Sequence, residues 1–399
     1  MSVTAAKGFR AAGVVAGLKE SGKPDLALVV NDGPHDVAAG VFTPTRVVAA
    51  PVVWSRNAVA DGTARAVVLN SGSANACTGE RGATDARATA EYLAGVLSSQ
   101  PGAAPVDAND VLVCSTGVIG APIDMPVLLA GASAAVAALD ASAEAAHRAA
   151  TAIMTTDTVS KEDALTLEGP AGTWSLGGMI KGVGMLAPGM ATMLCVLTTD
   201  AVVTADDARA ALVAAAARTV NRINSDGCMS TNDTVLLLAS GGSGVAPEQE
   251  ELDDAVAEVL GRLGRRLVAD AEGATHDIAI TVSGAVSEEA AEAAARTVSS
   301  SNLLKCAVAG ADPNWGRILS QLGTVPEDVC PFNPDEVDVA INGITIFSHG
   351  APQPNRDAVD MSPRETRIDI ELSAGPAQAT VWTNDLTHGY VTINADYTT

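Results

Sequence analysis

Apolar residues recur along the chain in two patterns, and each pattern predicts one type of element. Short aliphatic or β-branched runs that end in turn residues predict strands. These lie at residues 26–31, 66–69, 111–114, 193–199 and 232–239. Ala-rich stretches with apolar residues three and four positions apart predict helices. These cover residues 84–97, 127–139, 142–154, 205–220 and 247–267.

The last third of the chain alternates apolar and polar residues, as strands packed on one face do. This alternation predicts strands at residues 276–282, 337–341, 366–372 and 378–383. Residues 345–365, with several Pro, Asp and Arg, are predicted to be a surface excursion. No long Ser/Gly/Pro linker separates independent domains. Mixed strands and helices throughout predict an α/β or α+β layered architecture.

Composition narrows the class of protein. Aromatic residues make up 3% of the 399 residues, so the core must be built from small side chains that let sheets and helices approach closely. The net charge of -23 argues against a nucleic-acid partner. No signal peptide is expected, and no apolar run approaches the ~20 residues that cross a bilayer. The six cysteines are widely spaced and include no Cys-x-x-Cys pair, so they do not indicate a disulfide framework. We therefore expect a soluble, reduced, cytoplasmic protein.

Most catalytic motifs are absent from the sequence. Residues 182–187 match the dinucleotide fingerprint G-x-G-x-x-A, but Pro188 and Gly189 follow at once and break the helix that this fingerprint requires. There is no Walker A sequence, His-Glu-x-x-His motif or Gly-x-Ser-x-Gly elbow. The five histidines lack ligand spacing, so no metal site is expected.

The Ala191–Thr192 junction is the most informative feature of the chain. It follows a run of small, turn-forming residues in which glycines relax the backbone and Pro188 fixes one dihedral angle. A threonine held in such a turn can attack the preceding peptide bond. Cleavage would leave Thr192 with a hydroxyl nucleophile and an amine base on one residue. The amine, whose reference pKa is about 7.7–8.0, would remove the need for a histidine. The alternative is an ordinary Gly/Pro turn that enters a buried strand.

Residues 181–194 closely resemble the self-cleavage motif of the ornithine acetyltransferases, the bifunctional glutamate N-acetyltransferases of ArgJ type. The resemblance extends over essentially the whole chain, through further blocks in family order. These are GFRAAGVVAGLK at 8–19, NSGSANACTG at 70–79, STGVIG at 115–120, IMTTDT at 153–158, AEG at 271–273, DPNWGR at 312–317 and YVTINADYTT at 390–399.

The resemblance implies a ping-pong acetyl transfer in arginine biosynthesis. Acetyl would pass from N-acetylornithine to Thr192 and then to glutamate. Thr116 and the backbone amide of Gly117 would form an oxyanion hole. Independently, residues 114–117 are predicted to be a strand end that opens into a Gly turn. Substrate contacts carry over at Thr155, Lys181, Thr192, Glu272, Asn394 and Thr399.

Among these contacts, Lys181 suits the substrate carboxylate and Glu272 suits an ammonium group. If Thr399 contacts the substrate, as the resemblance implies, the C-terminus folds back over the site. Residues 70–77 and 225–233 hold many small polar residues that suit a pocket lining. Residues 312–317 are predicted to be a structural turn with Arg317 stacked on Trp315.

The family also implies an α/β (α+β) layered αββα-type sandwich with mixed sheets, as in the related DmpA-type aminopeptidases. It implies an α chain of residues 1–191 and a β chain of residues 192–399, interwoven in one body. Pairs of cleaved units would associate as an α2β2 heterotetramer. No cofactor is implied, although acetyl-CoA is a possible second acetyl donor.

Four residues depart from the family pattern: Val183 and Gly189, where Ser and Asn are common, and Cys228 and Met229, where Asp-Thr is usual. Two other classes of protein remain open. One is a self-processing β-aminopeptidase, against which the threonine nucleophile and the C-terminal block count. The other is a binding or structural protein without catalysis.

Overall fold

The computed structural model describes residues 2–186 and 193–396. Its first sheet has four strands in the order β1-β2-β4-β5, antiparallel except for the parallel pair β4–β5. The strands are β1 (Phe9–Val14), β2 (Leu26–Asn31), β4 (Ala66–Ser73) and β5 (Val111–Val118). All four precede residue 191.

The second sheet takes strands from both sides of residue 192. Its order is β3-β9-β8-β7-β6, with β8 and β9 parallel and the other neighbours antiparallel. The strands are β3 (Val37–Phe42), β6 (Lys161–Gly169), β7 (Gly172–Lys181), β8 (Leu194–Thr199) and β9 (Thr234–Ala239). The central strand β8 therefore begins two residues after Thr192.

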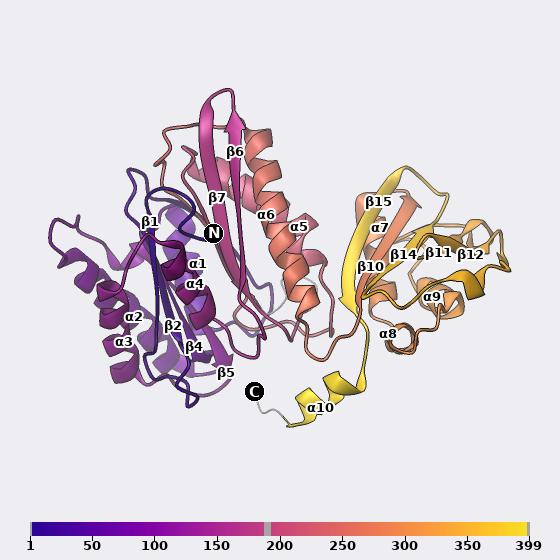
Figure 1. Ribbon diagram of the computed structural model, residues 1–399, viewed down its shortest axis with the longest axis horizontal. Helices are drawn as coiled ribbons and strands as arrows, with labels where there is room; N and C mark the ends of the chain where they lie inside the picture. The colour runs from indigo at the N-terminus through magenta and orange to yellow at the C-terminus, as the bar shows by residue number, and fades with distance from the viewer. Residues whose placement is uncertain (1, 187–192, 397–399) are drawn as a thin grey trace.

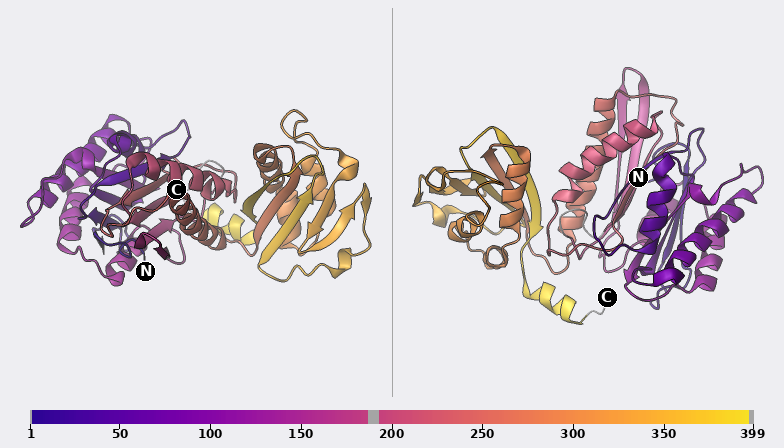
Figure 2. Two further views of the ribbon diagram at one scale, coloured as in Figure 1. Left: turned by 90° about the horizontal axis from the view of Figure 1, so that it is seen from above. Right: turned by 180° about the vertical axis from the view of Figure 1, so that it is seen from behind.

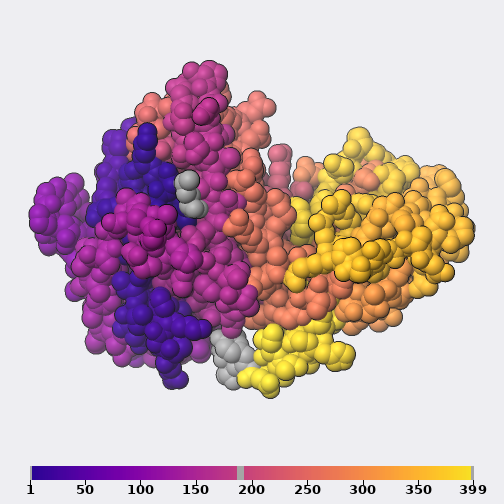
Figure 3. Space-filling model, in the orientation of Figure 1, coloured from indigo at the N-terminus to yellow at the C-terminus, as the bar shows by residue number. Residues whose placement is uncertain are grey.

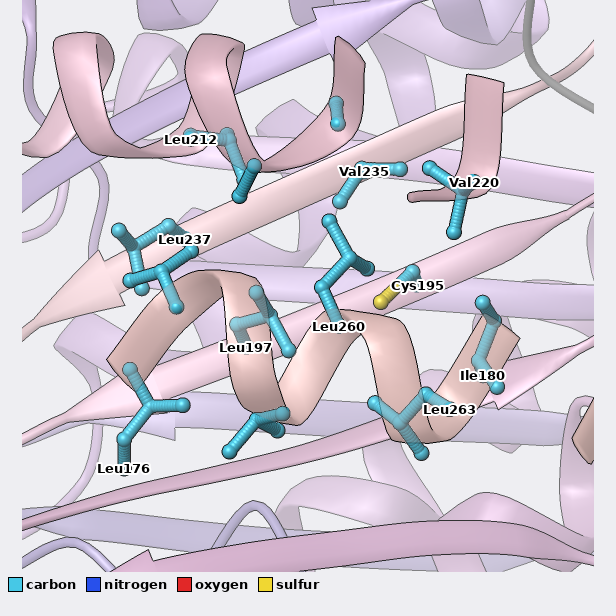
Figure 4. Close-up of a cluster of buried hydrophobic side chains, with 14 of the residues drawn as sticks. Leu176, Ile180, Cys195, Leu197, Leu212, Val220, Val235, Leu237, Leu260 and Leu263 are labelled. Carbon is cyan, nitrogen blue, oxygen red and sulfur yellow. The ribbon is translucent and has the colours of Figure 1, made fainter. Parts of the chain in front are cut away.

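Helices cover the outer faces of these two sheets (Figures 1 and 2). On the first sheet, α2 (Gly79–Ser98) and α3 (Met125–Ala137) share one core with the strands. On the second sheet, α5 (Ala205–Arg218) and α6 (Gln249–Ala269) pack over side chains such as Leu197 and Leu237 (Figure 4). A further cluster, which includes Val29, Leu69 and Val196, lies between the sheets. This is the αββα sandwich that the family resemblance implies.

Small residues make this close packing possible, as the composition predicts. The buried side of α5 consists largely of Ala208, Ala211, Ala215 and Ala216. Two further helices complete the sandwich. They are α1 (Ala50–Ala58), which packs near β5, and α4 (Ala143–Ala152), whose buried alanines join the core between the sheets.

A third sheet lies beside the sandwich and has its own core (Figures 1 and 2). Its strand order is β13-β12-β11-β14-β10-β15. The strands are β10 (Asp277–Ala285), β11 (Asp338–Ile341), β12 (Ile344–Ser348), β13 (Ala351–Pro352), β14 (Glu365–Glu371) and β15 (Ala377–Asn384). The helices that pack with it are α7 (Glu288–Ser299), α8 (Asn302–Ala309) and α9 (Trp315–Leu322).

The last helix, α10 (His388–Asp396), leaves the end of β15 and passes beneath the sandwich, at its surface (Figures 1 and 3). Short 3₁₀ turns complete the described elements at Val59–Asp61, Ala108–Asp110, Val220–Arg222, Pro334–Glu336 and Arg356–Ala358. Within residues 2–186 and 193–396, no helix has both the length and the apolar character that a membrane span requires.

The prediction of a surface excursion at residues 345–365 is wrong in its first part. These residues contain most of β12 and all of β13, and Ile346 and Phe347 are buried. The connection from β11 is the dipeptide Asn342-Gly343, and both residues have a positive φ. Two positive φ values at the centre of a tight hairpin are typical of the type I′ turn that Asn-Gly favours.

Candidate active site

A cavity of about 140 Å³ lies where the ends of β5 and β7, the loop after α6 and helix α10 meet. It brings together six of the predicted site residues and four further residues. The lining consists of Thr116, Gly117, Thr155, Thr156, Lys181, Val183, Gly184, Met185, Glu272 and Asn394. These residues come from five segments that are far apart in the sequence. The remaining two predicted residues, Thr192 and Thr399, lie outside the described residues.

Lys181, the last residue of β7, is 2% exposed and provides the cation of this cavity. Its Nζ donates to Thr155 Oγ1 at 2.8 Å and to Thr116 Oγ1 at 3.3 Å. Burial lowers the pKa of Lys181, while the nearby carboxylate of Asp157 opposes that change. Among the described residues, the two threonines accept from two of the three N–H donors of this buried ammonium group and so fix its position.

Asp157 links Lys181 to a second buried lysine. Its Oδ1 accepts hydrogen bonds from Lys161 Nζ at 2.7 Å and from the backbone N–H of Gly182 at 2.8 Å. Its Oδ2 lies 3.9 Å from Lys181 Nζ. Burial is the largest influence and opposes ionisation, but Lys181 and Lys161 together lower the pKa of Asp157 to about 2. Asp157 is therefore an ionised anchor for the loop that leads toward residue 192.

Lys161 extends this network to the end of α6, because its Nζ also lies 2.6 Å from Asp270 Oδ2. Neither Asp157 nor Lys161 stands among the site residues predicted from sequence. The predicted block at 153–158 includes Asp157, but its role becomes visible only in the hairpin of β6 and β7. There Lys161 pairs with Ile180, next to Lys181.

Thr116 and Gly117 lie within β5, not in a turn after Cys114 as predicted, because the strand continues to Val118. The ladder to β4 shifts register at Gly72 and Ser73, opposite Gly117. Gly117 has φ +130°, and a Cβ there would lie 2.4 Å from the carbonyl carbon of Gly72. Only glycine fits this conformation and this approach. The oxyanion hole at Gly117 stays a prediction.

Glu272 connects three parts of the cavity wall. Its Oε1 accepts from Thr156 Oγ1 and its Oε2 from Asn394 Nδ2, each at 3.1 Å. Its own backbone N–H donates to the carbonyl of Val183 at 3.0 Å. A Cβ on Gly184 would lie 2.8 Å from Glu272 Oε2, so a side chain at residue 184 would displace this carboxylate. Through Asn394, Glu272 also holds α10 against the cavity.

The chain on either side of residues 187–192 is fixed by two aspartates. The N–H of Met185 donates to Asp226 Oδ2 at 2.7 Å, and the N–H of Met193 donates to Asp233 Oδ1 at 3.1 Å. In the antiparallel pair β7–β8, Lys181 lies opposite Leu194. Residue 192 is therefore two residues along the chain from the partner of Lys181.

The other candidate segments have different positions. Ser225, Asp226 and Gly227 line a neighbouring cavity of about 290 Å³ that shares Glu272. Residues 70–77 mainly support β5, for example through the hydrogen bond from Ser115 Oγ to Asn70 Oδ1 at 2.6 Å.

At residues 312–317, the predicted stacking of Arg317 on Trp315 is wrong. Trp315 stacks on Phe347, with ring centroids 4.9 Å apart, and Arg317 donates to the Leu303 carbonyl. The described residues include no group of three or more His, Cys, Asp or Glu side chains that could hold a metal ion.

Comparisons with known proteins show the family of the chain. The model of the ArgJ family matches residues 10–399. The chain is 58% identical over 399 residues to the arginine biosynthesis bifunctional protein ArgJ of Bifidobacterium longum, covering 100% of both chains. It is 53% identical to the protein of that name from Streptomyces coelicolor, also with 100% of both chains covered.

Among solved structures, the chain is similar to the ornithine acetyltransferase of Mycobacterium tuberculosis crystallised with ornithine. That match has 50% identity and a TM-score of 0.45, and it covers 48% of this chain and 96% of that chain.

The layered αββα fold with a small concave site at the strand ends is typical of an enzyme that binds a small molecule. Within that class, the chain belongs to the ArgJ family. It is an acetyltransferase of arginine biosynthesis, and not an aminopeptidase.

Proposed function

We propose that the enzyme cleaves itself between Ala191 and Thr192 and then carries acetyl on the Thr192 hydroxyl. In cleavage, Thr192 Oγ attacks the carbonyl carbon of Ala191, the C–N bond breaks, and the nitrogen takes up the hydroxyl proton. Water hydrolyses the resulting ester, which restores the hydroxyl and leaves a carboxylate on Ala191. The free amine is then the base for the acetyl-transfer steps.

Acetyl transfer follows in two halves. Thr192 Oγ attacks the acetyl carbonyl of N-acetylornithine while the amine of Thr192 takes the proton, and ornithine leaves with that proton. The amine of glutamate then attacks the acetyl ester and regenerates the hydroxyl. Each half develops an oxyanion, for which Thr116 and the Gly117 amide are the proposed donors.

Substrate recognition is proposed to divide between the two charged residues of the cavity. Lys181 pairs with the α-carboxylate that ornithine and glutamate share. Glu272 pairs with the side-chain ammonium of N-acetylornithine, which glutamate lacks. Thr155 and Asn394 orient the substrate, and Thr399 is proposed to complete the site from the C-terminus.

The wider organisation of the enzyme is proposed on the family resemblance. Fragments 1–191 and 192–399 stay together, since the second sheet takes strands from both, and two such pairs form an α2β2 heterotetramer. Acetyl-CoA is proposed as a second acetyl donor, no cofactor is required, and the enzyme acts in the cytoplasm. An assay that compares N-acetylornithine with acetyl-CoA as donor to glutamate tests the second activity.

One observation supports this function above all others: six of the site residues predicted from the sequence line one cavity. The test compares the wild-type protein with Thr192→Ala, by intact mass and by acetyl transfer to glutamate. We expect two fragments, 1–191 and 192–399, and full activity for the wild type, and one uncleaved, inactive chain for the variant. Thr173→Ala, at an exposed position of β7, is the matched control and should behave as wild type. Normal turnover by Thr192→Ala would reject the mechanism.

A further inference from the structure

Strand β5 lies at one edge of the first sheet, and side chains from outside the sheet bind its outward carbonyl groups. Along an edge strand, the backbone groups of alternate residues point away from the sheet and need other partners. Helix α1 supplies two of these partners. Trp54 Nε1 donates to the carbonyl of Val111 at 3.0 Å, and Ser55 Oγ donates to that of Val113 at 2.7 Å. The outward residues of β5 are therefore 111 and 113 and, by alternation, 115 and 117.

Asn232 continues this series of partners at Ser115. Its Nδ2 donates to the carbonyl of Ser115 at 2.9 Å and to the carbonyl of Ala74, in the loop after β4, at 2.6 Å. Its Oδ1 accepts from Thr231 Oγ1 at 2.5 Å. The residue is 4% exposed, so these hydrogen bonds are formed away from bulk water. Both N–H donors of this amide side chain are therefore committed to the two carbonyl groups.

The backbone of Asn232 belongs to the second sheet, because it lies two residues before β9. The residues that follow it are bound to the start of β8. Met193 N–H donates to Asp233 Oδ1 at 3.1 Å, and Thr234 N–H donates to the Met193 carbonyl at 3.0 Å. The side chain of Asn232 therefore connects the start of β8 and β9 with β5 in the first sheet. In the proposed cleaved enzyme, it connects fragment 192–399 with fragment 1–191.

The next outward donor on the edge of β5 is the N–H of Gly117, one of the two proposed oxyanion donors. The φ of +130° at Gly117 turns the chain beyond this N–H, so residues 115 and 116 set the direction of the N–H. We propose that Asn232 is a positioning residue for the oxyanion donors: by holding the Ser115 carbonyl, it fixes the backbone from which Thr116 Oγ1 and Gly117 N–H point. This proposal rests on the proposed function, which assigns the oxyanion hole to Thr116 and Gly117.

Asn31, the last residue of β2, offers a matched comparison. It is 1% exposed, and its Nδ2 also donates to two carbonyl groups, those of His35 at 3.0 Å and Ala239 at 3.4 Å. Its Oδ1 accepts from the N–H of Gly33 at 3.0 Å. Ala239 is the last residue of β9, so Asn31 also links the two sheets. Alanine at either position removes two buried donors, but Asn232 holds the strand of the oxyanion donors, whereas Asn31 holds the opposite end of β9.

The test measures acetyl transfer from N-acetylornithine to glutamate by wild type, Asn232→Ala and Asn31→Ala, with the cleaved fraction of each determined by intact mass. The oxyanion forms only during reaction, so a displaced donor lowers kcat without weakening substrate binding. We expect Asn232→Ala to lose at least tenfold in kcat per cleaved molecule, with both KM values changed less than twofold. Asn31→Ala should keep kcat within twofold of wild type, whatever stability it loses.

Coupling to Thr116 separates a positioning role from a general loss of stability. If Asn232 acts through the oxyanion donors, Thr116→Ala already removes part of what Asn232 preserves. The double variant Asn232→Ala/Thr116→Ala should then lose at least threefold less in kcat than the product of the two single losses. For Asn31→Ala/Thr116→Ala, the loss should equal that product.

A second measurement depends on neither cleavage nor turnover. Amide hydrogen exchange of residues 111–118 is followed by mass spectrometry in the Thr192→Ala background, where we expect Asn232→Ala to speed exchange at least tenfold and Asn31→Ala to leave it unchanged. If Asn232→Ala does not fold, Asn232→Asp, which keeps the size of the side chain, takes its place in both measurements. Wild-type kcat in the Asn232 variant, multiplicative losses in its double variant, or unchanged exchange overturns the role of Asn232 while the proposed function stands. Wild-type kcat in Thr116→Ala overturns the proposed oxyanion hole and this role with it.

Discussion

Replacing Asp157 by asparagine removes the one negative charge between Lys161 and Lys181. The charged partners lower the pKa of Asp157 from 3.8 to about 2. At about 1.36 kcal/mol per pH unit, this difference corresponds to about 2 kcal/mol of stability. This value already contains the loss of the counter-charge to the two buried lysines, of which Lys161 keeps its contact with Asp270. We therefore expect the free energy of unfolding at pH 7 to fall by about 2 kcal/mol.

The pH dependence gives this prediction a sign. A carboxyl group whose pKa is depressed in the folded state stabilises the protein above its unfolded pKa, and that stabilisation is lost as the pH falls toward the folded pKa. The difference between wild type and Asp157→Asn should therefore be full at pH 7 and shrink between pH 4 and pH 2, as Asp157 takes up its proton.

Urea denaturation in the Thr192→Ala background measures this effect on a single uncleaved chain. Four tryptophans contribute to the fluorescence, and among them Trp174, a buried residue of β7, reports on the sandwich. Asp254→Asn, on the exposed side of α6, is the control and should change stability by less than about 0.5 kcal/mol. If Asp157→Asn is as stable as this control at pH 7, the assigned charge network is wrong.

Three further predictions concern the cavity. Lys181→Met should lower kcat/KM for acetyl transfer at least about 100-fold, because the buried ammonium is lost, while the protein still melts cooperatively. A loss below tenfold in a steady-state assay would reject the carboxylate-binding role of Lys181. Glu272→Gln should raise the KM for N-acetylornithine about tenfold and change the KM for glutamate less than threefold. Kinetics with each substrate varied in turn would check this, and equal changes in the two KM values would refute the ammonium contact. Gly184→Ala should displace the Glu272 carboxylate, slow self-cleavage and raise the KM for N-acetylornithine, whereas Gly95→Ala, at an open position of α2, should have no effect in the same assays.

Local patterns predict the strands and helices whose apolar residues have one clear period. The strand at 26–31 and the helix that begins at Ala205 are found as predicted, since β2 is buried throughout and α5 has a regular Ala stripe. The β6–β7 hairpin was not predicted, because β6 is a partly exposed edge strand that mixes charged and apolar residues. Strand β12 was not predicted, because the Pro, Asp and Arg residues that follow it indicated a loop and the Asn-Gly hairpin turn before it was overlooked.

The candidate site shows a similar division between local and distant features. Thr116, Lys181 and Glu272 were identified through short motifs, because each motif is a continuous stretch of sequence. The Asp157–Lys161–Lys181 network was not, because hairpin register brings its members together, and register is a property of the folded sheet. Asp233 depends in the same way on the parallel pairing of β8 with β9, whose strands are separated by α5 in the chain.

The acetyl group itself tests the central claim most directly. Wild-type enzyme is incubated with N-acetylornithine in the absence of glutamate, quenched in acid and analysed by intact and fragment mass spectrometry. We expect one added acetyl group on fragment 192–399, located on the side chain of Thr192 and removed when glutamate is supplied. An acetyl group on another side chain, carried by a fully active chain whose bond between residues 191 and 192 is intact, would contradict the mechanism.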